Sequence, residues 1–105
     1  MPYQIHLNTI ASRDIRQFFR YLKREAGEVI ALNYLAALEY ELQVVIANSP
    51  YAFSWFHETG QPYRAKLFKL ARTTYWIIYT IDEDRQRVEI TRLWNSARHP
   101  ETHGL

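Results

Sequence analysis

Arg64 and Lys66, two cations one residue apart, have a type and spacing that could do chemistry. Residues 63–70 alternate in a way that predicts a β-strand, and alternate residues of a strand point to the same face. The two side chains should therefore lie side by side, with Phe68 on their face. Paired cations of this kind bind phosphate and other anions.

Three further arginines could extend this pair into a larger basic site. The candidate cluster consists of Arg64, Lys66, Arg72, Arg92 and Arg98, with Tyr75 or Trp76 as stacking surfaces for a planar base. A structural interpretation competes with this one and is the more common case, because exposed strands often carry Lys and Arg that discourage pairing with other sheets.

Proton transfer would be sought first among the histidines, at positions 6, 57, 99 and 103. His6 alternates outward on a predicted strand and His57 lies in an aromatic loop. His99 and His103 have metal-like spacing, but Pro100 interrupts any helix that would align them. The glycines are isolated and cysteine is absent, so we expect no metal, no cofactor and no nucleotide-binding loop.

The composition is that of one compact domain over residues 1–105, with 48% hydrophobic residues and a net charge of +2. Its basic character lies in the second half, where residues 62–105 carry eight Lys and Arg against five Asp and Glu. Unbroken apolar runs are shorter than a bilayer requires, and the first residues do not resemble a signal peptide. We expect a cytoplasmic protein with no membrane-spanning segment.

The elements that must position these residues follow from hydrophobic periodicity. Period-two patterns predict strands at residues 3–8, 63–70, 74–81 and 87–93, and helical patterns predict one helix from Thr9 or Ser12 to Gly27 and another from Glu28 to Ala47. The order predicts an α+β fold, β-α-α-β-β-β, in which a helical hairpin covers one face of a sheet built around a three-stranded antiparallel meander. A regular last strand would place Arg92 on the same face as Val88 and Ile90.

Several sequence segments in this order are similar to the RelE/ParE superfamily of toxins from type II toxin–antitoxin systems. The segments are SRDIRQFFRYL, ALNYLAALEYELQVVIANSP, YWIIYTIDEDRQRVEI and RLWNSARHPE. Most specific is the C-terminal third, where Tyr75, Ile77, Ile78, Tyr79, Ile81, Val88, Glu89, Ile90, Arg92, Leu93, Arg98 and Pro100 fit the family pattern. The resemblance covers nearly the whole chain and implies a RelE/ParE-like fold.

The resemblance implies one of three functions. RelE-like members are ribosome-dependent mRNA endoribonucleases that use no metal; here Arg64, Lys66 and Arg92 would bind the phosphate, and His99 would be the nearest proton-transfer group. Trp76, however, stands where the family usually has an arginine. The ending with Arg92, Arg98 and Pro100 is closer to ParE-like plasmid stabilisation toxins, which cause growth arrest by binding DNA gyrase. A non-toxic, antitoxin-binding member is the third interpretation.

For target binding, the resemblance singles out Arg64, Lys66, Arg72, Trp76, Arg92 and Arg98. It also implies a cognate antitoxin, and either a homodimer or a toxin–antitoxin hetero-oligomer. A disordered antitoxin segment could fold across aromatic residues of the hairpin and the following loop. The candidates are Phe18, Phe19, Tyr21, Phe53, Trp55 and Phe56, although core packing explains most of them equally well.

Overall fold

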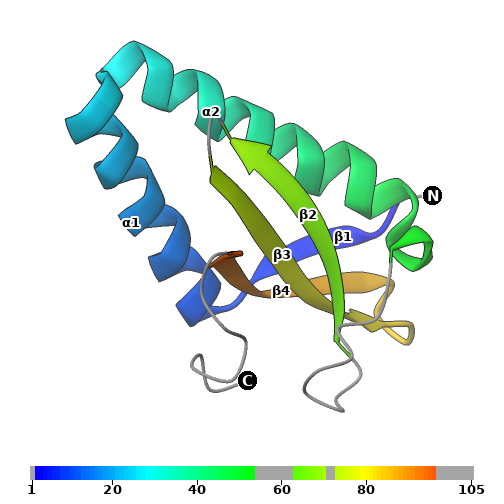
Figure 1. The fold of residues 1–105 in the computed structure, drawn as a ribbon. Coiled ribbons are helices and arrows are strands. Elements are labelled where there is room, and N and C mark those ends of the chain that lie inside the picture. Colours follow the sequence, from blue (N-terminus) through cyan, green and yellow to red (C-terminus); the bar gives the residue numbers. More distant parts are fainter. Residues whose placement is uncertain (1, 54–62, 71–72, 97–105) are drawn as a thin grey trace.

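The predicted α+β architecture is confirmed by a computed structural model of the chain (Figure 1), which describes residues 2–53, 63–70 and 73–96. The elements are β1 (Gln4–Leu7), α1 (Thr9–Ala26), α2 (Glu28–Tyr40), the π-helical turn η1 (Glu41–Ile46), the 3-10 turn η2 (Pro50–Ala52), β2 (Arg64–Leu70), β3 (Thr73–Asp82) and β4 (Arg87–Asn95). The helical hairpin covers one face of the sheet.

The four strands form one mixed sheet in the order β1-β4-β3-β2. Strands β2, β3 and β4 form the predicted antiparallel meander. Strand β1 adds to it in parallel with β4, with Ile5 opposite Val88 and Leu7 opposite Ile90. The α1–α2 hairpin is thus part of the crossover between two parallel neighbours, which a short link could not make.

Helix α1 begins at Asn8, whose side-chain Oδ1 accepts a hydrogen bond from the amide of Ala11 at 2.7 Å. The sequence had suggested Thr9 or Ser12 as the cap. The cap is Asn8 instead, because the strand ends one residue earlier than predicted. The helix ends at Gly27, whose φ of 91° is a conformation that side chains disfavour. Its amide donates to the carbonyl of Lys23, and α2 starts at the next residue.

The second helix is apolar on nearly all sides. Residues Glu28–Ile46 span 19 residues at a mean hydropathy of 1.4, and by length and composition alone this segment could cross a membrane. Only 22% of it is buried, through Ala31, Leu38, Leu42 and Ile46, of which the last three pack in the core with residues of the sheet. The segment is thus one wall of the folded core. The single predicted helix over 28–47 changes to π-helix at Glu41.

The main core lies between the hairpin and the face of the sheet that the hairpin covers. Its buried residues are Ala11, Phe18, Leu38, Leu42, Ile46, Phe68, Ile77, Tyr79, Val88, Ile90 and Leu93. A second, smaller cluster lies on the opposite face of the sheet, called the far face below. It contains Ala65, Ile78 and Trp94, with Tyr63 and Trp76 packed against it. The alternation predicted for residues 63–70 is therefore confirmed for Phe68 and Ala65.

Glu83, in the turn between β3 and β4, ties three segments together. Its carboxylate accepts hydrogen bonds from the hydroxyl of Tyr3, which precedes β1, and from that of Tyr51 in η2, the latter at 2.7 Å. Hydrogen bonds from Tyr3 and then Tyr51 lower the pKa of Glu83 below its usual 4.5. The same interaction raises the pKa of Tyr3 to about 12.

We expect Glu83→Gln to lower the urea midpoint at pH 7 and to flatten its acid dependence. A carboxylate whose pKa is lowered by folding stabilises the protein above its unfolded-state pKa, and that contribution is lost as the pH falls through the lower, folded-state pKa. The difference between wild type and variant should therefore shrink below about pH 4. Asp84→Asn, in the same turn, is the control; equal profiles for all three proteins would contradict the prediction.

Candidate functional site

The outer edge of β4 is held by a carboxylate from helix α1. Strand β1 pairs with β4 only from Arg87 to Ile90, so within the described residues no strand covers the edge beyond Ile90. There, Asp14 accepts a hydrogen bond from the amide of Leu93 at 3.1 Å. A buried backbone amide needs such a partner, and Asp14 supplies it where the sheet does not.

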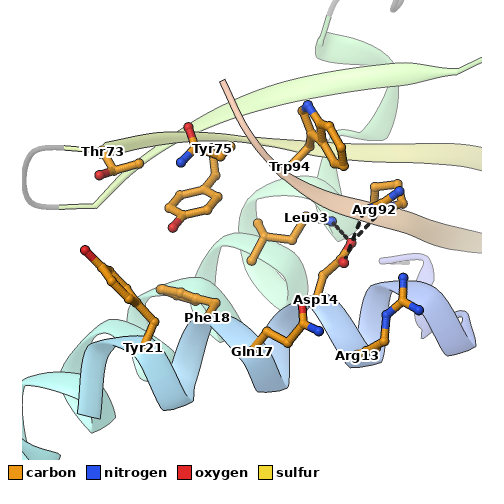
Figure 2. Close-up of a pocket in the computed structure, with 11 residues that line it drawn as sticks. Arg13, Asp14, Gln17, Phe18, Tyr21, Thr73, Tyr75, Arg92, Leu93 and Trp94 are labelled. Carbon is orange, nitrogen blue, oxygen red and sulfur yellow. Dashed lines mark hydrogen bonds and ion pairs between the residues drawn. The ribbon is translucent and has the colours of Figure 1, made fainter. Parts of the chain in front are cut away.

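The same carboxylate binds Arg92 at two points. Arg92 donates from Nε to Oδ2 of Asp14 at 2.7 Å and from a terminal nitrogen to Oδ1 at 3.3 Å (Figure 2). The side chains are only 14% and 7% exposed, respectively. The guanidinium also lies 4.5 Å from the ring centroid of Trp94. Charge-assisted bonds in a dry setting hold Arg92 in one orientation.

A β-bulge places Arg92 on the far face of the sheet. Ile78 is opposite Arg92 whereas Tyr79 is opposite Ile90, which leaves Thr91 as the extra residue. The hydroxyl of Thr91 donates to the carbonyl of Ile78 at 3.1 Å. The prediction that Arg92 shares a face with Val88 and Ile90 is therefore wrong, because the bulge shifts the alternation by one residue.

Arg64 and Lys66 lie together, as predicted, but on the face that the hairpin covers. Arg64 donates to the carbonyl of Phe53 at 2.7 Å, and its guanidinium lies 5.0 Å from the ring centroid of Tyr51. Lys66 forms an ion pair with Glu41 of η1 and lies 5.4 Å from the ring centroid of Phe53. Burial lowers the pKa of Lys66. Both cations thus bind groups of their own chain.

The structure does not bring this pair together with Arg92. Lys66 is opposite Ile77, which is opposite Leu93, and all three belong to the hairpin side of the sheet. Arg92 precedes Leu93 and belongs to the other side. The remaining predicted residues Arg72, Arg98, His99, Trp55 and Phe56 lie outside the described residues.

Trp76, the residue in place of the usual arginine, packs on the far face. It is half-buried, opposite Leu67 on β2 and Trp94 on β4. These three side chains form an apolar row across the sheet, beside the cluster of Ala65 and Ile78. Trp76 thus fills space among apolar neighbours.

The hairpin aromatics differ in their accessibility. Phe18 is buried in the core, with its ring centroid 5.4 Å from that of Tyr75. Phe19 and Phe53 are half-buried, and Phe53 packs against the core. Tyr21, at 50% exposed, is the most accessible of these four predicted residues.

A pocket of about 660 Å³ opens between α1 and the ends of β3 and β4 (Figure 2). It is lined by Arg13, Asp14, Gln17, Phe18, Tyr21, Thr73, Tyr75, Arg92, Leu93, Trp94 and Asn95. Tyr21 and Tyr75 project into it from opposite sides. Aromatic walls with polar groups at the rim suit a peptide segment or a planar polar group.

Sequence reasoning missed Asp14 and Glu41, the two carboxylates that engage the predicted cations. A signal for Asp14 was available, because Ala11, Asp14 and Phe18 share one helical stripe and a carboxylate there should meet the core. Within the described ranges, no group of three or more His, Cys, Asp or Glu side chains could hold a metal ion.

No protein-family model matches the sequence, and no curated protein matches it. Solved structures do match. A chain of the toxin–antitoxin complex RelBE2 from Mycobacterium tuberculosis superimposes with a TM-score of 0.65 at 20% identity, over 93% of this chain and 95% of that one. A chain of the chromosomal ParDE toxin–antitoxin system from P. aeruginosa gives 0.61 at 13% identity, over 89% and 95%. The expected RelE/ParE-like fold is thereby confirmed.

We expect Asp14→Ala to lower the free energy of unfolding by about 3 kcal/mol, because it removes the carboxylate that binds both a buried guanidinium and a buried amide. Urea denaturation followed by circular dichroism measures this. Replacing both members of the pair, in Asp14→Leu with Arg92→Leu, should cost less than Asp14→Ala alone. Asp84→Ala, on the exposed turn, should change stability by less than about 0.5 kcal/mol; an equally small effect at Asp14 would show that the pair is dispensable.

Proposed function

We propose that this chain is the toxin of a type II toxin–antitoxin pair, acting in the cytoplasm as a ParE-like inhibitor that binds its target. The fold supports the general assignment, since the two structures described above come from toxin–antitoxin systems and match over nearly their whole length. The choice of binding over catalysis rests on this chain's own geometry.

The separation of Lys66 from Arg92 is the observation that favours binding over catalysis. Metal-independent cleavage of RNA requires groups that stabilise the phosphate and groups that transfer protons, all held at one place. Here Lys66 is paired with Glu41 of η1, whereas Arg92 is paired with Asp14 of α1 at the outer edge of β4. A surface that only binds does not need this convergence.

DNA gyrase is the proposed target, engaged through the basic C-terminal half. Arg92 and Arg98 are the residues on which we place this role, with Arg72 and Trp76 as further contacts. Ion pairing with Asp14 orients Arg92 beside Trp94 at the end of β4. A ribosome-dependent mRNA endoribonuclease remains the second candidate because the RelBE2 chain is also similar to this one.

The proposed antitoxin would place a segment in the pocket between α1 and β4. Arg13 and Tyr21, both exposed, offer a cation and an aromatic ring at its rim. An acidic segment with an aromatic or aliphatic anchor is complementary to them. Such a segment would also cover the neighbourhood of Arg92.

Pulse-labelling of DNA and protein synthesis, in the minutes after this chain alone is induced in a bacterial host, tests the proposal. We expect DNA synthesis to fall first. If protein synthesis falls first and mRNA 5′ ends appear within codons, the endoribonuclease is the correct function. If neither falls, the chain is not a toxin.

We expect Arg98→Glu to reduce growth arrest by at least tenfold, because charge reversal turns attraction for an anionic target surface into repulsion. Arg85→Glu, on the exposed turn after β3, makes the same change of charge and should leave arrest unchanged. Circular dichroism of both purified variants should show the wild-type fold. Full toxicity of the Arg98 variant would remove the C-terminal surface from the mechanism.

A further inference from the structure

Helix α1, which runs along one side of the molecule (Figure 1), carries a stripe of cations on its outer face. The five exposed residues of this α1 stripe are Arg13, Arg16, Arg20, Lys23 and Arg24. At about 3.6 residues per turn they fall within an arc of about 100°, opposite the buried Ala11, Asp14 and Phe18. They are all the Lys and Arg of residues 1–62, where six Asp and Glu balance them in number. The balanced charge of this half of the chain therefore conceals a basic surface.

Most of the α1 stripe is not neutralised by the rest of the chain. Arg24 pairs with the neighbouring Glu25 at 3.5 Å and lies 5.9 Å from the ring centroid of Tyr21. The ion pairs among the described residues do not include the other four cations of the stripe. Like charges three or four positions apart repel one another and destabilise a helix. An anion laid along the stripe would relieve this repulsion.

The residues that lie among these cations favour a phosphate backbone as the anion. Thr9, Ser12 and Gln17 are on the same side of the helix, and no apolar residue of α1 lies among them. Interfaces with protein partners have an apolar centre. Phosphate groups of nucleic acids, in contrast, are bound by Arg and Lys together with Ser, Thr and Gln side chains. The apolar side of α1 is buried in the core, so the helix does not insert into a lipid surface either.

The shape of the α1 stripe favours duplex DNA. The stripe runs for about 17 Å from Arg13 to Arg24, and a duplex presents closely spaced phosphates over that whole length. Single strands are held mainly by stacking on aromatic side chains, and the arc of the stripe contains no aromatic residue. The major groove of B-form DNA admits an α-helix, whereas that of duplex RNA is deep and narrow.

We propose that the outer face of α1 binds the phosphate backbone of duplex DNA without reading its sequence. The main contacts are the three cations of the stripe that neither border the pocket nor join an ion pair among the described residues: Arg16, Arg20 and Lys23. Binding of this kind requires neither gyrase nor an antitoxin, so its failure would leave the proposed function standing.

Fluorescence anisotropy of a labelled DNA duplex of arbitrary sequence, titrated with the purified chain from about 50 mM to about 200 mM salt, tests this binding. The logarithm of the affinity falls with the logarithm of the salt concentration, with a slope of about 0.9 for each phosphate contact. Arg16→Gln combined with Arg20→Gln should make this slope shallower by about 1.8 and weaken binding at least tenfold at the lowest salt concentration. Gln forms helices about as well as Arg and removes like-charge repulsion, so the urea midpoint of this variant should not fall.

Lys69→Gln combined with Arg85→Gln is the matched control, because it removes the same charge from exposed positions on β2 and in the turn after β3. This control should leave the slope nearly unchanged. Equal losses in the two double variants would show that net charge alone attracts DNA, which overturns the proposal. A wild-type chain that does not bind the duplex in this salt range, or that binds a glutamate-rich peptide or a single-stranded RNA more tightly through the same residues, overturns it as well.

Discussion

The rest of this structure depends on which groups form hydrogen bonds with the backbone at the outer edge of β4. Strand β1 is four residues long and covers only part of that edge, so the backbone groups of β4 beyond Ile90 need another hydrogen-bond partner. Asp14 provides it, and in doing so fixes the position of α1 against β4, the direction of Arg92 and one wall of the pocket. A single buried carboxylate thereby links the hairpin, the sheet edge and the candidate binding surface.

The sequence was sufficient to predict the order and type of the helices and strands, because hydrophobic periodicity shows which side of each element is buried. The hairpin, the meander and the pairing of Arg64 with Lys66 on one face all follow from it. The placement of β1 beside β4 could not be predicted in this way, since alternation shows that a strand has a buried face but not which neighbour it joins.

The candidate site was less predictable, for two physical reasons. One extra residue at Thr91 reverses the alternation of β4, and a bulge leaves little trace in the hydrophobic pattern. Periodicity also does not show whether a strand cation is bound internally. Glu41 and Asp14 engage Lys66 and Arg92 from helices more than twenty residues away in sequence, so a basic pattern that suggested one anion site became two separate ion pairs.

The parallel pairing of β1 with β4 has a consequence for synthesis of the chain. Gln4–Leu7 are synthesised well before their partners, residues 87–90. The sheet cannot close, and Asp14 cannot reach Leu93, until residues 87–93 have been translated. A nascent chain of this topology stays incompletely folded until β4 has left the ribosome, so a surface that depends on β4 forms only after the other strands have been made.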